Sequence, residues 1–191
     1  MSRAMVRFAQ LSALTRRYVE ALRDDRAGVA ATEFALLLPL MITLYLGGVE
    51  VSQAVAIDRK VSLTARTVAD LTSQSSVINN TDMQNILDAS TAVMSPYGAS
   101  NVQIVLSFVQ LDATKTATVG WSDAKNASPR PQNSSVSVPS GIAIANSTLV
   151  MAEVKYPYKP TIGYVITGTL NLTETFFMRP RLQDTITRTA S

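Results

Sequence analysis

The chain has 191 residues, enough for one ordinary domain with an appendage, and it contains neither cysteine nor histidine. Their absence excludes thiol catalysis, Cys/His zinc sites, disulfides and imidazole acid–base chemistry. Hydrophobic residues make up 47% and charged residues 16%, which excludes a disordered tail or a nucleic-acid-binding arm. The sequence has no phosphate-binding loop, metal-ligand cluster or carboxylate pair at catalytic spacing. We therefore expect no enzymatic activity, no cofactor and no bound metal.

The basic excess lies in residues 1–28, which hold six arginines against three acidic residues, while the remainder of the chain is neutral. A DNA-binding patch would belong to the folded part of the chain, so we expect no nucleic-acid partner. We interpret residues 1–28 as a cytoplasmic basic leader. Its apolar residues recur at helical spacing, which leaves open an amphipathic helix on anionic lipid or an unstructured segment.

The segment from Val29 to Val49 is long and apolar enough to cross a membrane. It has 21 residues with a single charge, Glu33, and as a helix it would span about 31 Å. Arginines precede it and Glu50 follows it, so the positive-inside rule predicts that residues 50–191 are exported. We expect a single-pass membrane protein that has membrane lipid as a partner. Glu33 either solvates its carboxylate at the interface or pairs with a partner, because an unpaired carboxylate in a span costs about 2–3 kcal/mol.

The residues around Glu33 carry a family resemblance. Arg26-Ala27-Gly28 followed by Val29 to Ala35 resembles the type III cleavage site of prepilins, where a basic leader ends in glycine and the fifth mature residue is glutamate. More narrowly, G-x-A-A-x-E-F-A-L-x-L-P resembles TadE/TadF-like minor pilins (pseudopilins) of the tight-adherence (Tad/Flp) type IVb pilus system. Four later segments look like elements of the longer members: Val68–Leu71, Trp121–Ala124, Tyr156–Tyr158 and Met178–Arg181. The chain departs from many relatives in lacking distal cysteines.

The resemblance implies processing and assembly. A prepilin peptidase would cut between Gly28 and Val29, where glycine offers no side chain to clash. The cut creates an ammonium group, and Glu33 of a neighbouring subunit can accept a charge-assisted hydrogen bond from it. The implied partners are the peptidase, the major Flp-type pilin, other minor pilins and the inner-membrane assembly platform. The implied location is the inner membrane, with the N-terminus cytoplasmic and the C-terminus periplasmic, or the cell surface within the pilus.

Two alternatives stay open. Ala54-Val55-Ala56 is an A-x-A sequence that would suit ordinary signal peptidase and leave a soluble chain beginning at Ile57. The chain could also be a signal-anchored periplasmic binding or adhesion module unrelated to pili. An ordinary anchor has no use for Gly28 or Glu33, so these two residues distinguish the minor pilin from that module.

Helical patterns continue beyond the span. Residues 50–72 place apolar side chains at 3- and 4-residue steps, at Ala54, Ile57, Val61, Ala65, Val68 and Leu71 or Thr72. We expect Pro39 to kink the resulting long helix. Thr81 and Gln84 form a capping-box pattern for a second, short helix that stops before Pro96.

Strand patterns follow at 102–111, 115–121, 148–158 and 166–178, with a long loop over 126–140. Pro157 and Pro160 predict that the third strand ends at a sheet edge. Trp121 is expected in the core. The fold class is therefore α+β: a long N-terminal membrane-spanning helix continues into a pilin-like domain with a second short helix and an antiparallel sheet of about four strands. The domain boundaries are a cleaved leader (1–28), a transmembrane helix (29–49), an exported helical extension (50–72) and an exported α+β domain (73–191).

Overall fold

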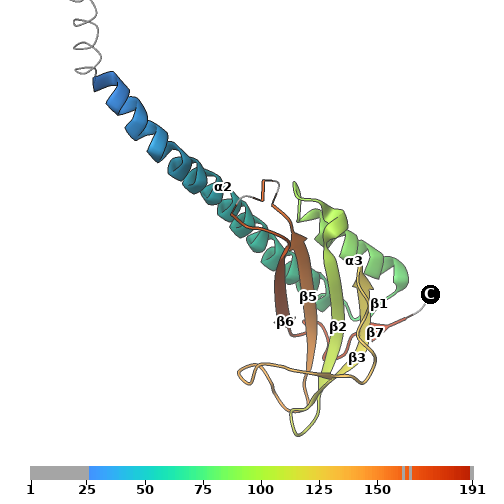
Figure 1. Cartoon of the computed structure of the whole chain (residues 1–191). Helices are drawn as coiled ribbons and strands as arrows, with labels where there is room; N and C mark the ends of the chain where they lie inside the picture. Colours follow the sequence, from blue (N-terminus) through green and yellow to red (C-terminus); the bar gives the residue numbers. More distant parts are fainter. Residues whose placement is uncertain (1–25, 161, 164, 190–191) are drawn as a thin grey trace, which may run out of the picture. The chain divides into compact units, whose positions relative to one another are not determined.

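The structure is a computed structural model that describes residues 26–160, 162–163 and 165–189 (Figure 1). The chain divides into two compact units, residues 1–48 and 49–191, and each is considered by itself. Most of the expected leader, residues 1–25, lies outside the described residues.

The first element is the helix α2, Arg26–Ser73, a single helix of 48 residues. The helix continues through Pro39, whose carbonyl accepts a hydrogen bond of 2.8 Å from the Thr43 hydroxyl. The kink expected at Pro39 stays a prediction. The predicted apolar stripe beyond the span is confirmed, because its members are buried: Ala54, Ile57, Val61, Ala65, Val68 and Thr72, with Leu71 partly buried.

The second helix, α3, covers Asn80–Ala92, and its cap differs from the prediction. Asn79, rather than Thr81, is the N-cap: its side chain accepts from the Asp82 amide at 2.8 Å, and the Asp82 carboxylate accepts from the Asn79 amide at 3.3 Å. The three-residue spacing of a capping box occurs twice in this segment, between Asn79 and Asp82 and between Thr81 and Gln84. In the earlier pair the side chain that accepts from the N-cap amide is the carboxylate of Asp82, whereas in the later pair it would be the neutral amide of Gln84, and the helix dipole favours negative charge at this end.

A five-stranded antiparallel sheet forms the other layer, with the order β4-β3-β2-β5-β6. The strands are β2 (Gln103–Leu111), β3 (Ala117–Lys125), β4 (Ser135–Val136), β5 (Thr148–Tyr158) and β6 (Leu170–Met178). The α+β class and the antiparallel sheet are confirmed, and the sheet has one more strand than expected. The additional strand, β4, is a two-residue piece within the predicted loop, which is too short to leave a periodic pattern.

Two strand predictions need correction, those for β3 and β6. β3 continues to Lys125 because β2 pairs with it along nearly its full length, past a bulge between Phe108 and Val109. β6 begins at Leu170, later than predicted. β5 is an interior strand, but its end lies at an open side of the sheet, as predicted from Pro157, because β2 pairs with β5 only as far as Lys155. Pro157 therefore has a partner strand on one side only, where it lies opposite Asn171.

A two-stranded parallel sheet, which the sequence did not predict, joins β1 (Val77–Ile78) to β7 (Thr187–Arg188). Arg188 strengthens this junction, since its guanidinium donates to both Asp123 carboxylate oxygens, at 2.8 and 3.2 Å, and to the Asn80 side chain at 2.7 Å. A short 3₁₀ helix, Ala99–Asn101, leads into β2. The last described residues thus tie the turn between the helices to the sheet.

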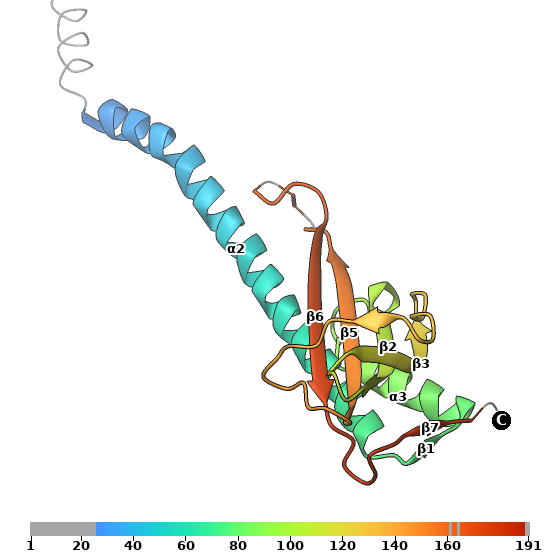
Figure 2. The ribbon, with the colours of Figure 1, turned by 90° about the horizontal axis from the view of Figure 1, so that it is seen from below.

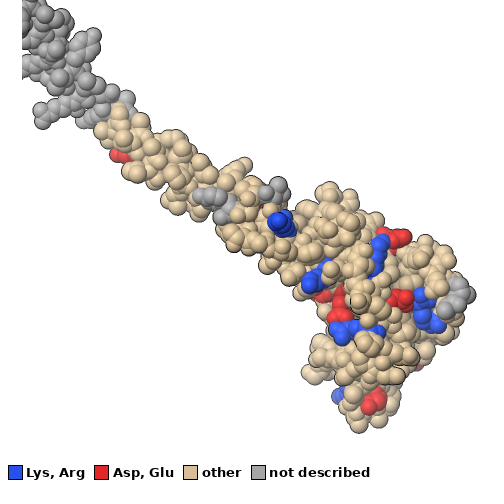
Figure 3. Space-filling view, turned by 45° about the vertical axis from the view of Figure 1, so that its right-hand side comes forward, with Lys and Arg blue, Asp and Glu red and all other residues tan. Residues whose placement is uncertain are grey.

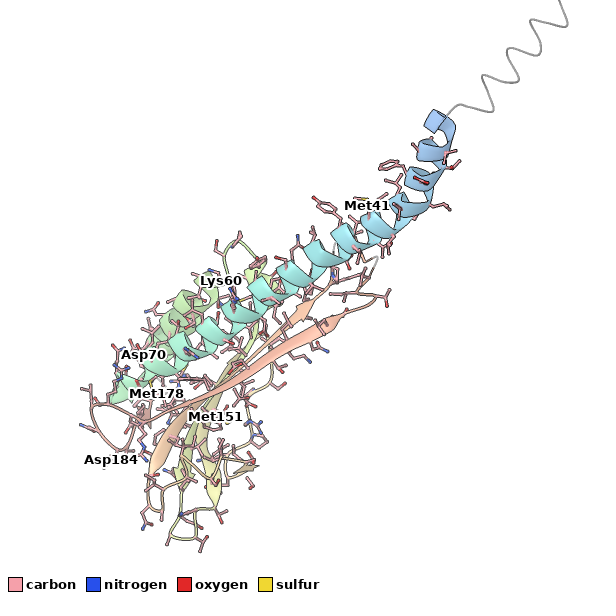
Figure 4. The ribbon with its side chains drawn as sticks, turned by 90° about the vertical axis from the view of Figure 1, so that its left-hand side faces the viewer. Met41, Lys60, Asp70, Met151, Met178 and Asp184 are labelled. Atoms are coloured by element: carbon pink, nitrogen blue, oxygen red, sulfur yellow. The ribbon has the colours of Figure 1, made fainter. Side chains whose placement is uncertain are left out.

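The main core lies between the helices and one face of the sheet (Figure 2). It combines the α2 stripe and the apolar face of α3 with alternate residues of β2 and β5. Figure 4 shows α2 running beside the sheet, with Lys60 and Asp70 on the helix and Met178 at the end of β6. Trp121 is partly buried in this core, where its ring stacks on Phe108 with centroids 5.8 Å apart and its indole N–H donates to the Ile186 carbonyl.

A smaller apolar cluster covers the opposite face of the sheet at one end. It joins β2, β3 and β5 to the connection between β3 and β5; its buried members are Val109, Leu111, Ala117, Leu149 and Met151. Val136 and Val138 of that connection pack against it, so the long predicted loop folds over the sheet face.

Candidate functional site

The N-terminal half of α2 presents apolar side chains that its own unit does not cover. Leu36 is 81% exposed and Tyr45 is 70% exposed, and neighbouring leucines are also exposed. In Figure 3 this stretch carries almost no charge, whereas lysine, arginine, aspartate and glutamate gather on the folded domain. An apolar helix surface of this size needs lipid or partner helices around it.

The predicted processing and assembly residues lie together in the first turns of α2. Val29 is 57% exposed, and a side chain added at Gly28 would have no atom within 4 Å. Glu33 lies four residues after Val29, one turn along the same helix face, and its side chain is exposed. Among the described residues Glu33 has no ion-pair partner. The Thr32 hydroxyl donates to the Val29 carbonyl at 2.8 Å, which satisfies that polar side chain locally.

Within the described part of the chain, α2 is the one helix that is long and apolar enough to cross a membrane. Its apolar window lies near the N-terminus, as the sequence predicted for residues 29–49. The length and composition of the helix are those of a single-pass membrane protein.

The family comparison concerns this same helix. Residues 28–70 match the model of the family described as TadE-like protein. This segment is TadE-like. The match includes Gly28, Val29, Glu33 and Pro39, so the resemblance drawn from the sequence is confirmed over α2 and indicates a protein related to the Tad pilus. No curated protein and no solved structure gives a match to the chain.

The TadE-like segment runs without a break into the folded domain, which argues against signal-peptidase cleavage at Ala54-Val55-Ala56. Ala54 is 8% exposed and belongs to the main core. Cleavage after Ala56 would also remove Glu50, a buried carboxylate that accepts hydrogen bonds from the amides of Val165 and Ile166 at 3.1 and 2.8 Å. Two amides would lose their acceptor, at a cost of about 1–3 kcal/mol each.

All four of the later segments that carry the resemblance form structural contacts. Asp70, near the end of α2, forms an ion pair with Arg181, and the Arg181 amide donates to the Ser73 carbonyl at 2.9 Å. Asp123 holds Arg188, as described above. The Tyr158 hydroxyl donates to the side-chain oxygen of Gln53 at 3.3 Å, and burial, reinforced by the nearby carboxylate of Glu50, raises the pKa of Tyr158. The contacts of Arg181 and Tyr158 fasten the sheet to α2, and the Asp123–Arg188 pair fastens β7 to β3.

The sequence did not indicate a cleft of about 340 Å³ on the sheet face opposite the helices, between β2, β5 and β6. Arg130 donates to both oxygens of Glu153 there, at 2.6 and 2.7 Å, and the carboxylate raises the pKa of the guanidinium. Arg130 lies in the long connection between β3 and β5, and Glu153 lies in β5, so their ion pair fixes this connection onto the sheet. Among the described residues there is no group of three or more aspartates and glutamates that could hold a metal ion.

Proposed function

We propose that this protein is a minor pilin, or pseudopilin, that acts in the assembly or initiation of a Tad (Flp) pilus or at its tip or base. The observation that carries the proposal is the exposed apolar half of α2 with one carboxylate, Glu33, five residues after Gly28 in a TadE-like segment. A prepilin peptidase would release the leader after Gly28. The mature chain would then begin at Val29.

The cleavage and the carboxylate form one mechanism. Before the cut, Val29 contributes a neutral amide; after it, the same nitrogen is an ammonium group. In a helical bundle of low polarity, the Glu33 carboxylate of one subunit accepts a charge-assisted hydrogen bond from the ammonium of the next, and such a bond is about twice as strong as a neutral one. The bond sets the axial stagger between adjacent helices in the filament. An unprocessed subunit has no ammonium group at Val29, so it cannot form the bond and does not fit into the filament. Proposed partners are therefore the peptidase, the major pilin, other minor pilins and the inner-membrane assembly platform.

The Glu33→Gln substitution tests this mechanism. Glutamine keeps the size of the side chain but loses the charge, so the variant should be cleaved and held in the membrane normally, yet fail to enter or initiate filaments. Processing is followed on a gel, and surface pili are counted by microscopy. Asp58→Asn is the matched control, because Asp58 is an exposed carboxylate of the same helix beyond the span. Normal pili that contain the Glu33→Gln protein would remove the role that we assign to Glu33.

The proposed orientation leaves residues 1–28 in the cytoplasm and exports residues 50–191, because the arginines precede the span. We expect a reporter that works only in the periplasm to be active when fused after Ser191. The same fusion made with a reporter that works only in the cytoplasm should be inactive. Activity of the cytoplasmic reporter alone would reverse the topology and contradict the pilin assignment.

A further inference from the structure

The connection from β5 to β6, residues 159–169, exposes apolar side chains beside α2. Ile162 is 53% exposed and Val165 is 48% exposed, and Leu170, the first residue of β6, is 41% exposed. Lys159 is the single charged residue in this connection. Apolar side chains at this exposure, in a segment without acidic residues, favour contact with a surface that is apolar or anionic.

Glu50 holds the connection against α2. Glu50 as a whole residue is 1% exposed, and its Oε2 atom accepts from the amides of Val165 and Ile166 at 3.1 and 2.8 Å. Ile166 also packs against the main core. At the start of the connection, the Tyr158 hydroxyl donates to the Glu50 carbonyl at 3.4 Å.

Glu50 directly follows Val49, the residue at which the apolar run ends. With α2 across the membrane, a group hydrogen-bonded to Glu50 would lie where the span leaves the hydrocarbon. The exposed Ile162 and Val165 would then lie at the boundary between lipid headgroups and acyl chains. Lys159, at the start of the same connection, can reach the phosphates of that leaflet.

We propose that the β5–β6 connection is a second membrane contact, in which Ile162 and Val165 enter the acyl-chain boundary of the exported leaflet. The span anchors the chain, and the connection determines which face of the exported domain meets the membrane. The inference rests on α2 spanning the membrane, which is part of the proposed function, and does not depend on the pilus role.

The absence of cysteine from the chain allows a direct test. Full-length chain carrying Ile162→Cys is labelled with an environment-sensitive fluorophore and reconstituted into phosphatidylcholine–phosphatidylglycerol vesicles. Some of the lipids bear a nitroxide near the top of the acyl chain. The matched control is Ile144→Cys, because Ile144 has a similar exposure of 49% but lies before β5, at the opposite end of that strand. We expect the nitroxide to quench the label at position 162 several-fold more strongly than the label at position 144.

A third label distinguishes the possible failures. Leu37 is 55% exposed within the span, so a label at Leu37→Cys should be quenched by nitroxides deeper in the acyl chain. Lipid quenching at 37 with equal, weak quenching at 162 and 144 would overturn the membrane contact and leave the span intact. Weak quenching at position 37 together with weak quenching at position 162 would overturn both the membrane contact and the span. An apolar environment at 162 that disappears when labelled chains are diluted with lipid would show that a second copy of the chain covers the connection, which also overturns the proposal.

Discussion

We expect the Gly28→Val chain to accumulate at full precursor length, whereas the unsubstituted chain is found with Val29 at its N-terminus. The peptidase must bring the bond after residue 28 into its active site, and a β-branched side chain crowds that bond. The structure itself accommodates the change, because an added side chain at Gly28 meets no atom within 4 Å. The loss of processing would therefore reflect recognition by the peptidase and not misfolding of the substrate. Gel mobility and N-terminal sequencing by mass spectrometry measure the outcome.

The chain contains a matched control for this substitution. Gly48 lies in the same helix and also has no atom within 4 Å of an added side chain. Gly48→Val should therefore be processed like the unsubstituted chain. Processing of both variants would contradict the cleavage site, and a mature N-terminus at Ile57 would indicate ordinary signal peptidase instead.

The second large effect concerns the folded domain. Phe108 is 1% exposed, lies where the register between β2 and β3 shifts and stacks on Trp121 with an interplanar angle of 10°. Its replacement by alanine leaves a cavity in the core and should lower the free energy of unfolding by about 3–5 kcal/mol. Because domains are stable by only about 5–15 kcal/mol, this loss is a large fraction of the total.

Trp121 is the only tryptophan in the chain, so its fluorescence reports unfolding of the folded domain. In urea titrations of the detergent-solubilised full chain, the unfolding midpoint of Phe108→Ala should fall by roughly 2 M. Phe34→Ala is the control, since Phe34 is 58% exposed in the apolar half of α2 and should leave the midpoint unchanged. Equal midpoints for the two variants would show that the Phe108 ring does not support the core.

The elements that the sequence predicted correctly are those with a long, regular pattern. The α2 stripe runs over several helical turns, and every member of it is buried or partly buried. The boundaries of β5, 148–158, were predicted residue for residue, because its apolar run is bounded by turn residues on both sides. The candidate site is also a local motif: Gly28 and Glu33 lie in the segment that matches the TadE-like family, and their roles in processing and assembly stay predictions.

The features that the sequence did not reveal are non-local. β1 and β7 have two residues each, which leaves no periodicity, and they pair across more than half of the chain. Glu50 was interpreted only as a flanking charge of the span, because nothing in its neighbourhood indicates that amides of residues 165 and 166 will bind it. The cap of α3 was misassigned because Asn79 and Thr81 both begin a plausible capping box, and only the observed backbone distinguishes them.

The long sequence separation between α2 and its partners has a consequence for the order in which the domain forms. In the proposed orientation the α2 stripe emerges first from the membrane during synthesis, while its contacts come late: Ser62 bonds to Glu174, 112 residues further on, and Glu50 to Ile166, 116 residues further on. Until those strands are translocated, the apolar side of α2 has no sheet to cover it. Folding of the domain must therefore wait for nearly the whole chain to cross, and the newly emerged helix depends on lipid or a periplasmic chaperone during that interval.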